Sequence, residues 1–522
     1  MPALLLSAYA GDKGLEKIFA PFGDDSGQLR SLPKTSSLNR HNAFFDASIS
    51  TNGQACVTCH QPDQAFSIRI DSTNKAFAAT QGLDPLFRPV DTADRPDADV
   101  SNLEARKKAY KLFLDLGVVR IGKTFRGNSD PDSASTQSDF RVEHQNSPQF
   151  GALPNAKDPQ HAGTPSLSLF RRPLVNTNMN FDSSVLWDGR DKMDALAGSQ
   201  VPKAIQSLLL GPGTDMKANQ QIADFMTGVF TAQIADNGAK ELAKHGAAGG
   251  VQSLLKMSSD PSRPCLYMAA FPEAGKPVLT PRSPSTCTRI DDNNPRTFGM
   301  GLFDGWAKLP NDGANADRAA IARGQAIFNS AALHQPPDLD GKLPDVGSTA
   351  NGGANADHAD RIPAGKVIRC NTCHAARNLG NNPNPNFIGR IGTDSIDILE
   401  RLVATRGTQD PLVKNVLENV RKLPLYCLRP NTDTASFDAA ACGTHPGDVK
   451  TTDPGRAMVT GLIADAGKFK PPILRDLSGR APFFHAGTAA TVFELIDFYD
   501  ARFDIKLSPA QKKDLAKFLL AL

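Results

Sequence analysis

The chain has 522 residues, of which 40% are hydrophobic and 22% charged, and its 58 Lys and Arg against 55 Asp and Glu give a net charge of +3. This length exceeds what one compact core holds, so two or more domains are expected, and 42 Gly with 38 Pro predict a globular protein with much loop. The balanced charge without a long basic run argues against a nucleic-acid partner, and no apolar stretch is long enough for a transmembrane segment.

Four of the eight cysteines lie in two matching motifs. Cys56–His60 (CVTCH) and Cys370–His374 (CNTCH) both read C-x-x-C-H, the attachment sequence of c-type haem. In this motif the two thiols add to the porphyrin vinyl groups and the histidine ligates the iron. A pair of zinc knuckles or a redox C-x-x-C is the alternative. Zinc ribbons, however, place their halves about 15 to 20 residues apart, whereas these motifs begin at residues 56 and 370.

The sequence therefore predicts two covalently bound haem c groups as cofactors. The residues expected to hold them are Cys56, Cys59, His60, Cys370, Cys373 and His374. The two histidines are the expected proximal iron ligands.

The other four cysteines form two pairs that are close in sequence. Cys265 and Cys287 are 22 residues apart, and Cys427 and Cys442 are 15 apart, each pair in a loop rich in Pro, Ser, Thr or Gly. A disulfide in each pair would restrain its loop by about 3 kcal/mol; four free buried thiols are the alternative.

Disulfides and covalent haem both indicate an oxidising compartment, so a periplasmic or secreted protein is expected. The first residues, MPALLLSAYAGDKG, contain an apolar piece without a basic n-region, so they do not form a complete signal peptide. A trimmed export signal and an ordinary N-terminal segment both fit them.

The predicted elements of the first half are few. Residues 109–125 partly alternate apolar and polar side chains, and residues 140–142 resume the pattern, which predicts a small β-hairpin insertion. A helix is predicted from Asn219 to Ala235, because its apolar residues share one face.

The second half is more regular. Residues 316–328 have apolar side chains at helical spacing and precede the second motif, and residues 395–406 and 410–422 predict two further amphipathic helices. Residues 508–511 (SPAQ) form a capping box with Pro at the first helical position, so a helix packed on the core is expected to end the chain.

The preferred domain boundary is the polar loop 311–315. It divides an N-terminal haem domain, 1–313, from a C-terminal haem domain, 314–522. The predicted fold is mainly α, with two cytochrome c-like haem domains, long loops and the small β-hairpin insertion.

Several strings around the two motifs resemble the bacterial diheme cytochrome c peroxidase and MauG superfamily, in the order found in that superfamily. They are FFD at 44–46, TNG at 51–53, GTPSL at 163–167, WDGR at 187–190, RGQAIF at 323–328, LRD at 474–476 and RAPFFHAG at 480–487. The resemblance covers about half of the chain. It implies two helical domains whose haems face the domain interface, with a reactive N-terminal haem and an electron-transferring C-terminal haem.

The resemblance also implies roles for single residues. In the superfamily the tryptophan of the Trp-Asp-Gly-Arg string lies between the haems, so Trp187 is the candidate electron relay; core packing beside a porphyrin is compatible with that role. His485 is expected to be a hydrogen-bond partner of a haem propionate rather than an iron ligand.

The sixth iron ligands decide the chemistry, because an open position admits peroxide or O₂ and a filled one favours electron transfer. Peroxidases of this superfamily often carry a distal histidine soon after the first motif, yet residues 61–143 contain none. The first haem is therefore expected to be five-coordinate. For the second haem, the superfamily's sixth ligand lies 14 residues beyond the histidine that corresponds to His485, which indicates Tyr499. The alternative is that Tyr499 only packs in a core helix. Among the methionines, Met458 is the nearest other candidate for the sixth ligand.

Two departures from the superfamily concern peroxide and calcium. Gln206 and Asp215 are the nearest candidates for the distal Gln and Glu that position and deprotonate peroxide; solvated helix-end residues are the alternative. The Asn and Thr of an interdomain calcium site correspond to Gly163 and Arg480. Arg480 could replace the cation with its own charge, which makes bound calcium doubtful.

Three functions compete. The predicted one is a peroxidase/MauG-like diheme oxidoreductase that uses H₂O₂ as oxidant and takes electrons from a small redox protein or an organic donor. An O₂-dependent oxygenase similar to the rubber oxygenases is the first alternative, since large insertions and 28 Phe against 5 Tyr permit an apolar channel. A non-enzymatic diheme electron carrier is the second, but it needs two six-coordinate irons.

Overall fold

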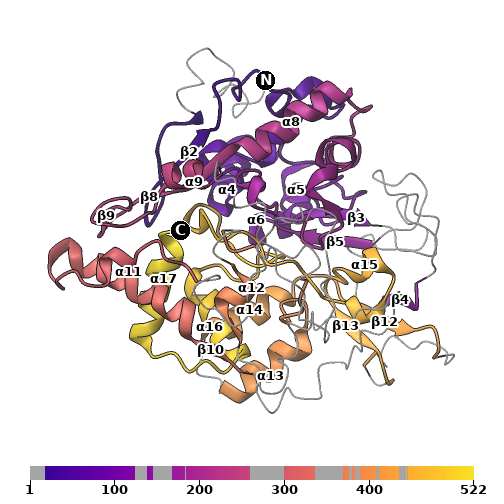
Figure 1. Cartoon of the computed structure of the whole chain (residues 1–522). Helices are drawn as coiled ribbons and strands as arrows, with labels where there is room; N and C mark the ends of the chain where they lie inside the picture. The colour runs from indigo at the N-terminus through magenta and orange to yellow at the C-terminus, as the bar shows by residue number, and fades with distance from the viewer. Residues whose placement is uncertain are drawn as a thin grey trace, which may run out of the picture.

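The computed structural model describes residues 18–123, 138–144, 167–182, 184–258, 299–334, 368–375, 379–381, 388–406, 411–433, 442–443 and 445–522. The predicted disulfide between Cys265 and Cys287 lies outside these residues, as does Gly163. Within them the chain is mixed and mainly helical. The two halves of the chain lie against each other, with the N-terminal half above the C-terminal half in the view of Figure 1.

Seven helices belong to each half of the described chain. The first half contains α3 (Cys56–Cys59), α4 (Ile70–Thr80), α5 (Leu103–Ala109), α6 (Lys111–Leu116), α7 (Val201–Ser207), α8 (Met216–Gly228) and α9 (Val251–Ser258). The second half contains α11 (Gly313–Ser330), α12 (Cys370–Cys373), α13 (Ile396–Arg406), α14 (Pro411–Val420), α15 (Ala457–Thr460), α16 (Val492–Arg502) and α17 (Pro509–Leu520). The four helices predicted for the second half are thus present.

The strands form small antiparallel sheets. One has the order β1 (Phe22–Gly23), β2 (Gly27–Pro33), β8 (Val229–Asp236) and β9 (Lys240–Glu241), and another has the order β13 (Val449–Thr451), β12 (Tyr426–Pro430) and β4 (Phe140–His144). Three two-stranded ladders pair β3 (Val119–Lys123) with β5 (Leu167–Arg171), β6 (Ser184–Val185) with β7 (Asp191–Lys192), and β10 (Ala332–Leu333) with β11 (Ile368–Arg369).

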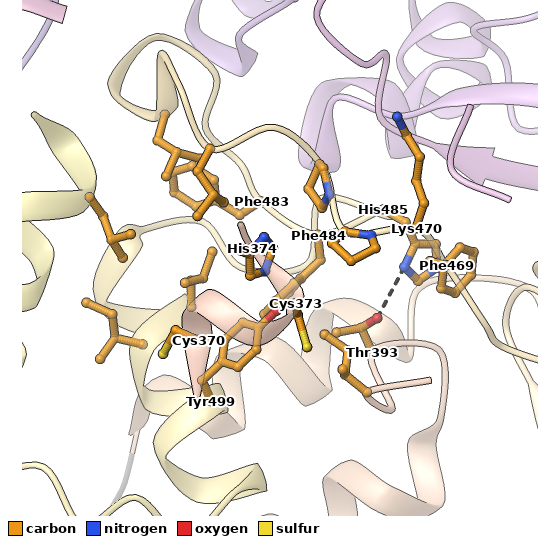
Figure 2. A pocket seen from close by; sticks show the side chains of 18 of the residues that line it. Cys370, Cys373, His374, Thr393, Phe469, Lys470, Phe483, Phe484, His485 and Tyr499 are labelled. Carbon is orange, nitrogen blue, oxygen red and sulfur yellow. Dashed lines mark hydrogen bonds between the residues drawn. The ribbon is translucent and has the colours of Figure 1, made fainter. Parts of the chain in front are cut away.

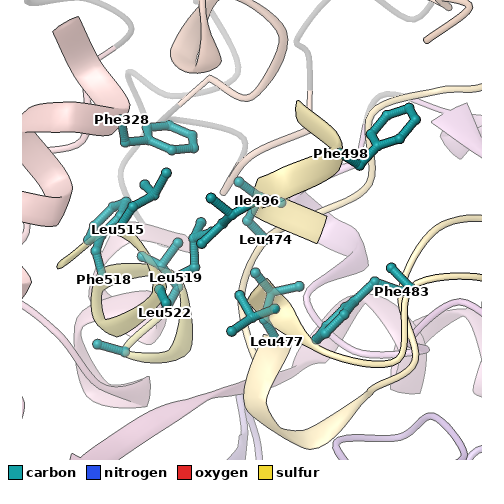
Figure 3. Packing of buried hydrophobic residues seen from close by; sticks show 14 of the residues in the cluster. Phe328, Leu474, Leu477, Phe483, Ile496, Phe498, Leu515, Phe518, Leu519 and Leu522 are labelled. Carbon is teal, nitrogen blue, oxygen red and sulfur yellow. The ribbon is translucent and has the colours of Figure 1, made fainter. Parts of the chain in front are cut away.

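The core of the second half forms where α11, α16 and α17 meet (Figure 3). The capping box that begins α17 is present, because the Ser508 side chain accepts from the Gln511 backbone N–H and the Gln511 side chain accepts from the Ser508 N–H. Gly324 of α11 allows α17 to approach closely, since a Cβ atom there would lie 2.0 Å from the Asp514 carbonyl oxygen. These contacts place one face of α17 against the core, as the sequence predicts.

The predicted β-hairpin insertion is wrong in its pairing. Residues 111–116 form helix α6, whose Leu112, Phe113 and Leu116 are buried, and the strand that follows, β3, pairs with β5. Strand β4 pairs with β12 of the second half, almost 300 residues away. Alternating apolar side chains indicate a strand but do not select its partner, because the partner is chosen by tertiary packing.

The predicted helix 219–235 is correct only up to Gly228. Helix α8 ends there, and β8 continues as a central strand between β2 and β9. Residues 229–233 are all buried, so β8 is covered on both faces. A strand buried on both faces lacks the alternation of apolar and polar residues by which periodicity distinguishes a strand from a helix.

The sheet that contains β4 and β12 joins the two predicted domains. Its register brings Tyr426 opposite His144 and Pro430 opposite Phe140. The Tyr426 hydroxyl also donates to the Ser168 carbonyl oxygen, 2.7 Å away. Among the helices of the described chain, none combines the length and apolar character needed to cross a membrane.

Candidate haem sites

The two C-x-x-C-H motifs adopt the same local structure. The four residues from Cys to Cys form a single helical turn in each, α3 and α12. A threonine hydroxyl in each turn accepts from the backbone N–H that precedes the turn, at 3.0 Å for both Thr58 and Thr372. The local fold therefore repeats although the two motifs lie in different surroundings.

The two histidines are also held in the same way. His60 Nδ1 lies 3.0 Å from the Phe66 carbonyl oxygen, and His374 Nδ1 lies 2.7 Å from the Gly380 carbonyl oxygen, six residues onward in both cases. A carbonyl oxygen only accepts, so Nδ1 carries the proton and the lone pair of Nε2 is left for a metal. A second-shell bond of this kind fixes the orientation of an iron-ligating imidazole.

Burial determines the protonation state of these groups. It lowers the pKa of His60 and of His374 to about 4, so both imidazoles are neutral at neutral pH, the form that ligates iron. Burial also raises the pKa of the Cys56 and Cys370 thiols to about 12. The four motif cysteines are not engaged in disulfides and are half-buried.

A large cavity lies beside the second motif (Figure 2). Cys370, Cys373 and His374 line it, and so do residues of the first half, among them Arg172 and Trp187. Its lining is otherwise rich in Phe, Leu, Ile and Pro side chains. An apolar cavity lined by two thiols and an imidazole fits a covalently attached porphyrin.

His485 is fixed on the wall of this cavity. Its ring stacks on Phe469, with centroids 3.9 Å apart, and its Nδ1 lies 3.3 Å from the Thr393 hydroxyl (Figure 2). Its Nε2 is buried and has no hydrogen-bond partner among the described residues. An unpaired buried nitrogen at a cavity wall indicates a polar group of a bound molecule.

Trp187 lies between the cavity and the first half. Its indole Nε1 donates to the Arg172 carbonyl oxygen at 2.8 Å, and its ring meets His485 edge-on with centroids 6.4 Å apart. Two residues beyond Arg172, the backbone of Leu174 hydrogen-bonds the His60 ring. A short stretch of chain thus connects the indole at the cavity with the histidine of the first motif.

The network behind Trp187 is made of buried ion pairs. Asp188, the next residue, accepts from Arg171 Nη1 at 2.6 Å, and Arg171 also forms a two-point ion pair with Asp453 at 2.6 and 2.9 Å. Arg190 pairs with Asp188 as well. These pairs hold the pKa of Asp188 well below its usual range in spite of burial, and they tie the Trp-Asp-Gly-Arg string to the second half.

Tyr499 is placed by α16 on the wall of the same cavity as Cys370, Cys373 and His374 (Figure 2). Its ring packs against Phe498 and Phe503, with centroids 5.8 and 5.9 Å away. Burial raises its pKa, and the nearby Cys373 and Cys370 raise it further. The cavity therefore brings together all three predicted residues of the second haem motif with the predicted sixth ligand.

Arg480 lines the cavity and is buried. Its Nη2 donates to the Ile473 carbonyl oxygen, and its Nε lies 3.4 Å from Asp476 Oδ1. Burial raises the pKa of Asp476 to about 7, although Arg480 and Arg475 oppose this shift.

Gln206 and Asp215 are not part of this cavity. Gln206 is exposed on α7, and Asp215 is the exposed N-cap of α8, whose side chain accepts from the Ala218 backbone N–H at 2.8 Å. Their predicted action on peroxide at the first haem stays a prediction.

Sequence reasoning missed most of the cavity lining, including Arg172, Phe469 and Lys470. The one available signal was the pair Arg171–Arg172 at the end of the apolar run LSLF, since adjacent arginines in a buried strand need partners. Phe469 and Lys470 occur in the string KFKPP, which has no distinctive pattern.

Comparison with known proteins gives one distant relationship. The chain is similar to the cytochrome-c peroxidase IdrP2 of Pseudomonas sp. (strain SCT), with 27% identity over 227 residues. The match covers 42% of this chain and 51% of that protein, so it spans about half the length of the curated relative. No protein-family model matches the chain, and no solved structure matches it significantly.

Proposed function

We propose that the chain is an exported diheme c-type oxidoreductase that reduces H₂O₂ at an open haem on His60. Electrons reach this site from a haem on His374, which a small redox protein or an organic donor reduces. The repeated geometry of the two motifs supports this proposal most strongly. The distant similarity to a cytochrome-c peroxidase supports the same class of reaction.

The roles of the chain's own residues follow from their contacts. The cysteine pairs Cys56/Cys59 and Cys370/Cys373 hold the two cofactors, and the carbonyl groups of Phe66 and Gly380 orient His60 and His374 through Nδ1. Bound haem iron supplies the one-electron chemistry that the side chains lack. Oriented imidazoles and an apolar surrounding then adjust its potential and limit the access of water.

Trp187 is the proposed relay between the two sites. It lines the cavity of the second motif, and its indole N–H is bonded to the segment that reaches His60. Tyr499 is the proposed sixth ligand at the second site, because it faces the same cavity as His374. No distal histidine follows the first motif up to residue 143, which favours an open first site.

Two measurements test the proposal. Mass spectrometry of the purified protein is expected to show two haem masses added to the polypeptide, and Cys56→Ala or Cys370→Ala should weaken the attachment of one haem each. EPR of the ferric protein is expected to show one high-spin signal, altered by H₂O₂, and one low-spin signal. A polypeptide mass without added haem would overturn the proposal. Two low-spin EPR signals would favour an electron carrier. A high-spin EPR signal that responds to O₂ but not to H₂O₂ would favour an oxygenase.

A further inference from the structure

Four buried cations gather where the first half meets the cavity of the second motif. They are Arg172, Lys470, Arg475 and Arg480, each less than a tenth exposed. Only two buried carboxylates of the described residues, Asp182 and Asp476, are electrostatically coupled to this group. Buried charges need partners of opposite sign, and Arg475 has a further contact, since its Nη1 donates to the Leu522 main-chain oxygen at 3.4 Å.

The pairing can be followed residue by residue. Lys470 Nζ lies 2.8 Å from Asp182 Oδ1, which neutralises both. Asp476 is shared by Arg480 and Arg475. Arg172 has no carboxylate partner within the described part of the chain; its guanidinium donates to the carbonyl oxygens of Gly117, Ile68 and Arg480 instead.

Arg172 is therefore the least compensated charge of the group. It is 4% exposed, and its pKa is lowered to about 9 by burial and by repulsion from Arg480. Yet it is part of the cavity lining. A protein that buries an arginine at a cavity wall without an acid of its own has a site for an anionic group of a ligand.

Arg172, Arg480 and His485 form one connected group. The Arg172 backbone N–H donates to the His485 carbonyl oxygen at 2.6 Å, and Arg172 Nη2 donates to the Arg480 carbonyl oxygen at 3.4 Å. Neither His485 Nε2 nor Arg480 Nε has a hydrogen-bond partner among the described residues, although Arg480 Nε lies 3.4 Å from Asp476 Oδ1. These atoms can donate to carboxylate oxygens without the loss of an existing hydrogen bond.

The position of this group suits one edge of a haem. Figure 2 shows Cys370 and Tyr499 on one side of the cavity and His485 with Lys470 on the other. The two thioether-bearing pyrrole rings of haem c lie opposite the two that carry propionates, so attachment at Cys370 and Cys373 directs the propionates away from these cysteines. A propionate carries the negative charge that Arg172 lacks among the described residues.

We propose that Arg172, from the first half of the chain, binds a propionate of the haem on His374 together with Arg480 and His485. This inference rests on the proposed function, since it needs the second haem. It makes the first half a part of the second haem site, so that the bound cofactor joins the two halves electrostatically.

The test is a redox titration and a resonance Raman spectrum of the intact holoprotein. Arg172→Met should lower one of the two reduction potentials, because loss of a cation next to a propionate favours the more positively charged ferric state. It should also shift the propionate-bending bands of one haem. In Arg172→Lys, which keeps the positive charge, the reduction potential and the propionate bands should stay close to those of the unmodified protein.

Lys468→Met is the matched control. Lys468 is 5% exposed and pairs with Asp465 at 3.2 Å, and it does not line the cavity. It should change neither the potentials nor the Raman bands. If Arg172→Met does not fold, Arg480→Met and Arg480→Lys provide the same comparison of a neutral with a charged side chain, by redox titration and by resonance Raman spectroscopy.

The outcomes separate the two proposals. Fewer than two covalent haems in the unmodified protein would contradict the proposed function. Two haems with unchanged potentials and unchanged propionate bands in both methionine variants would overturn the propionate assignment alone. An equal shift in the Lys468→Met control would assign the effect to general electrostatics and would also overturn it.

Discussion

The imidazole of His485 lies nearly parallel to the phenyl ring of Phe469, with 3.9 Å between the ring centroids and 17° between the ring planes. The guanidinium of Arg171 lies over the Phe469 ring as well, 5.8 Å from its centroid. Arg171 is itself fixed by Asp188 and Asp453. The string that carries Trp187 and the string that carries His485 are thus held in one packed unit, which gives the cavity a rigid wall.

Replacement of Trp187 by Phe should slow electron transfer between the two haems without a change in either resting spectrum. The indole is an oxidisable ring at the cavity, and phenylalanine keeps most of its packing volume but not its redox activity. Stopped-flow reduction followed at both haems measures this rate.

Trp306→Phe is a suitable control for this change. Trp306 is fully buried in the core of the second half, and its Nε1 also donates to a carbonyl oxygen, that of Lys244, at 2.9 Å. It does not line the cavity. Equal rates in Trp187→Phe and in the unmodified protein would remove the relay role from Trp187.

Replacement of Tyr499 by Phe should convert the second haem from low spin to high spin. The change removes the phenol oxygen that would fill the sixth position and leaves the packing against Phe498 and Phe503 nearly intact. Binding of small ligands at the first haem should be unaffected. EPR of the ferric protein measures both.

Tyr426→Phe provides the comparison. Tyr426 is buried, and its hydroxyl donates to the Ser168 carbonyl oxygen away from the cavity. Its replacement should affect stability but not the low-spin signal. A low-spin signal that persists in Tyr499→Phe would mean that this tyrosine only packs in the core.

Asp215 can be examined by two substitutions with different consequences. Asp215→Ala removes the side-chain cap of α8 and should lower the free energy of unfolding by about 1 kcal/mol. Asp215→Asn keeps a capping oxygen and should be nearly as stable. Loss of peroxide turnover in the Asn variant with unchanged thermal unfolding would support the predicted acid–base role, whereas full turnover would leave Asp215 as a helix cap.

The disulfide between Cys427 and Cys442, which the sequence predicts, is present. It links β12, the strand that pairs with β4 of the other half, to residue 442, and both cysteines are buried. Replacement of both cysteines by Ala should reduce the free energy of unfolding by about 3 kcal/mol, as for a loop of roughly 15 residues. Thermal unfolding followed by circular dichroism measures the loss, and an unchanged midpoint would show that the sheet holds this loop without the covalent link.

Local patterns predicted the features that depend on near neighbours along the chain. The spacing of Cys, Cys and His defines the haem motifs because one helical turn brings these side chains together, and α3 and α12 are such turns. The capping box of Ser508 and the periodicity of residues 316–328 predicted α17 and α11 for the same reason. In each case the hydrogen bonds that define the element join residues at most four positions apart.

Tertiary structure decided the features that depend on distant partners. The alternation of residues 140–142 could not show that β4 pairs with β12, and the pattern of residues 229–233 could not show that they form a strand covered on both faces. Arg172 has an ordinary sequence position, yet folding buries it beside Arg480 without a carboxylate partner. Such burial depends on which surfaces of the two halves meet, because desolvation and charge pairing are properties of the packed chain and not of its order of residues.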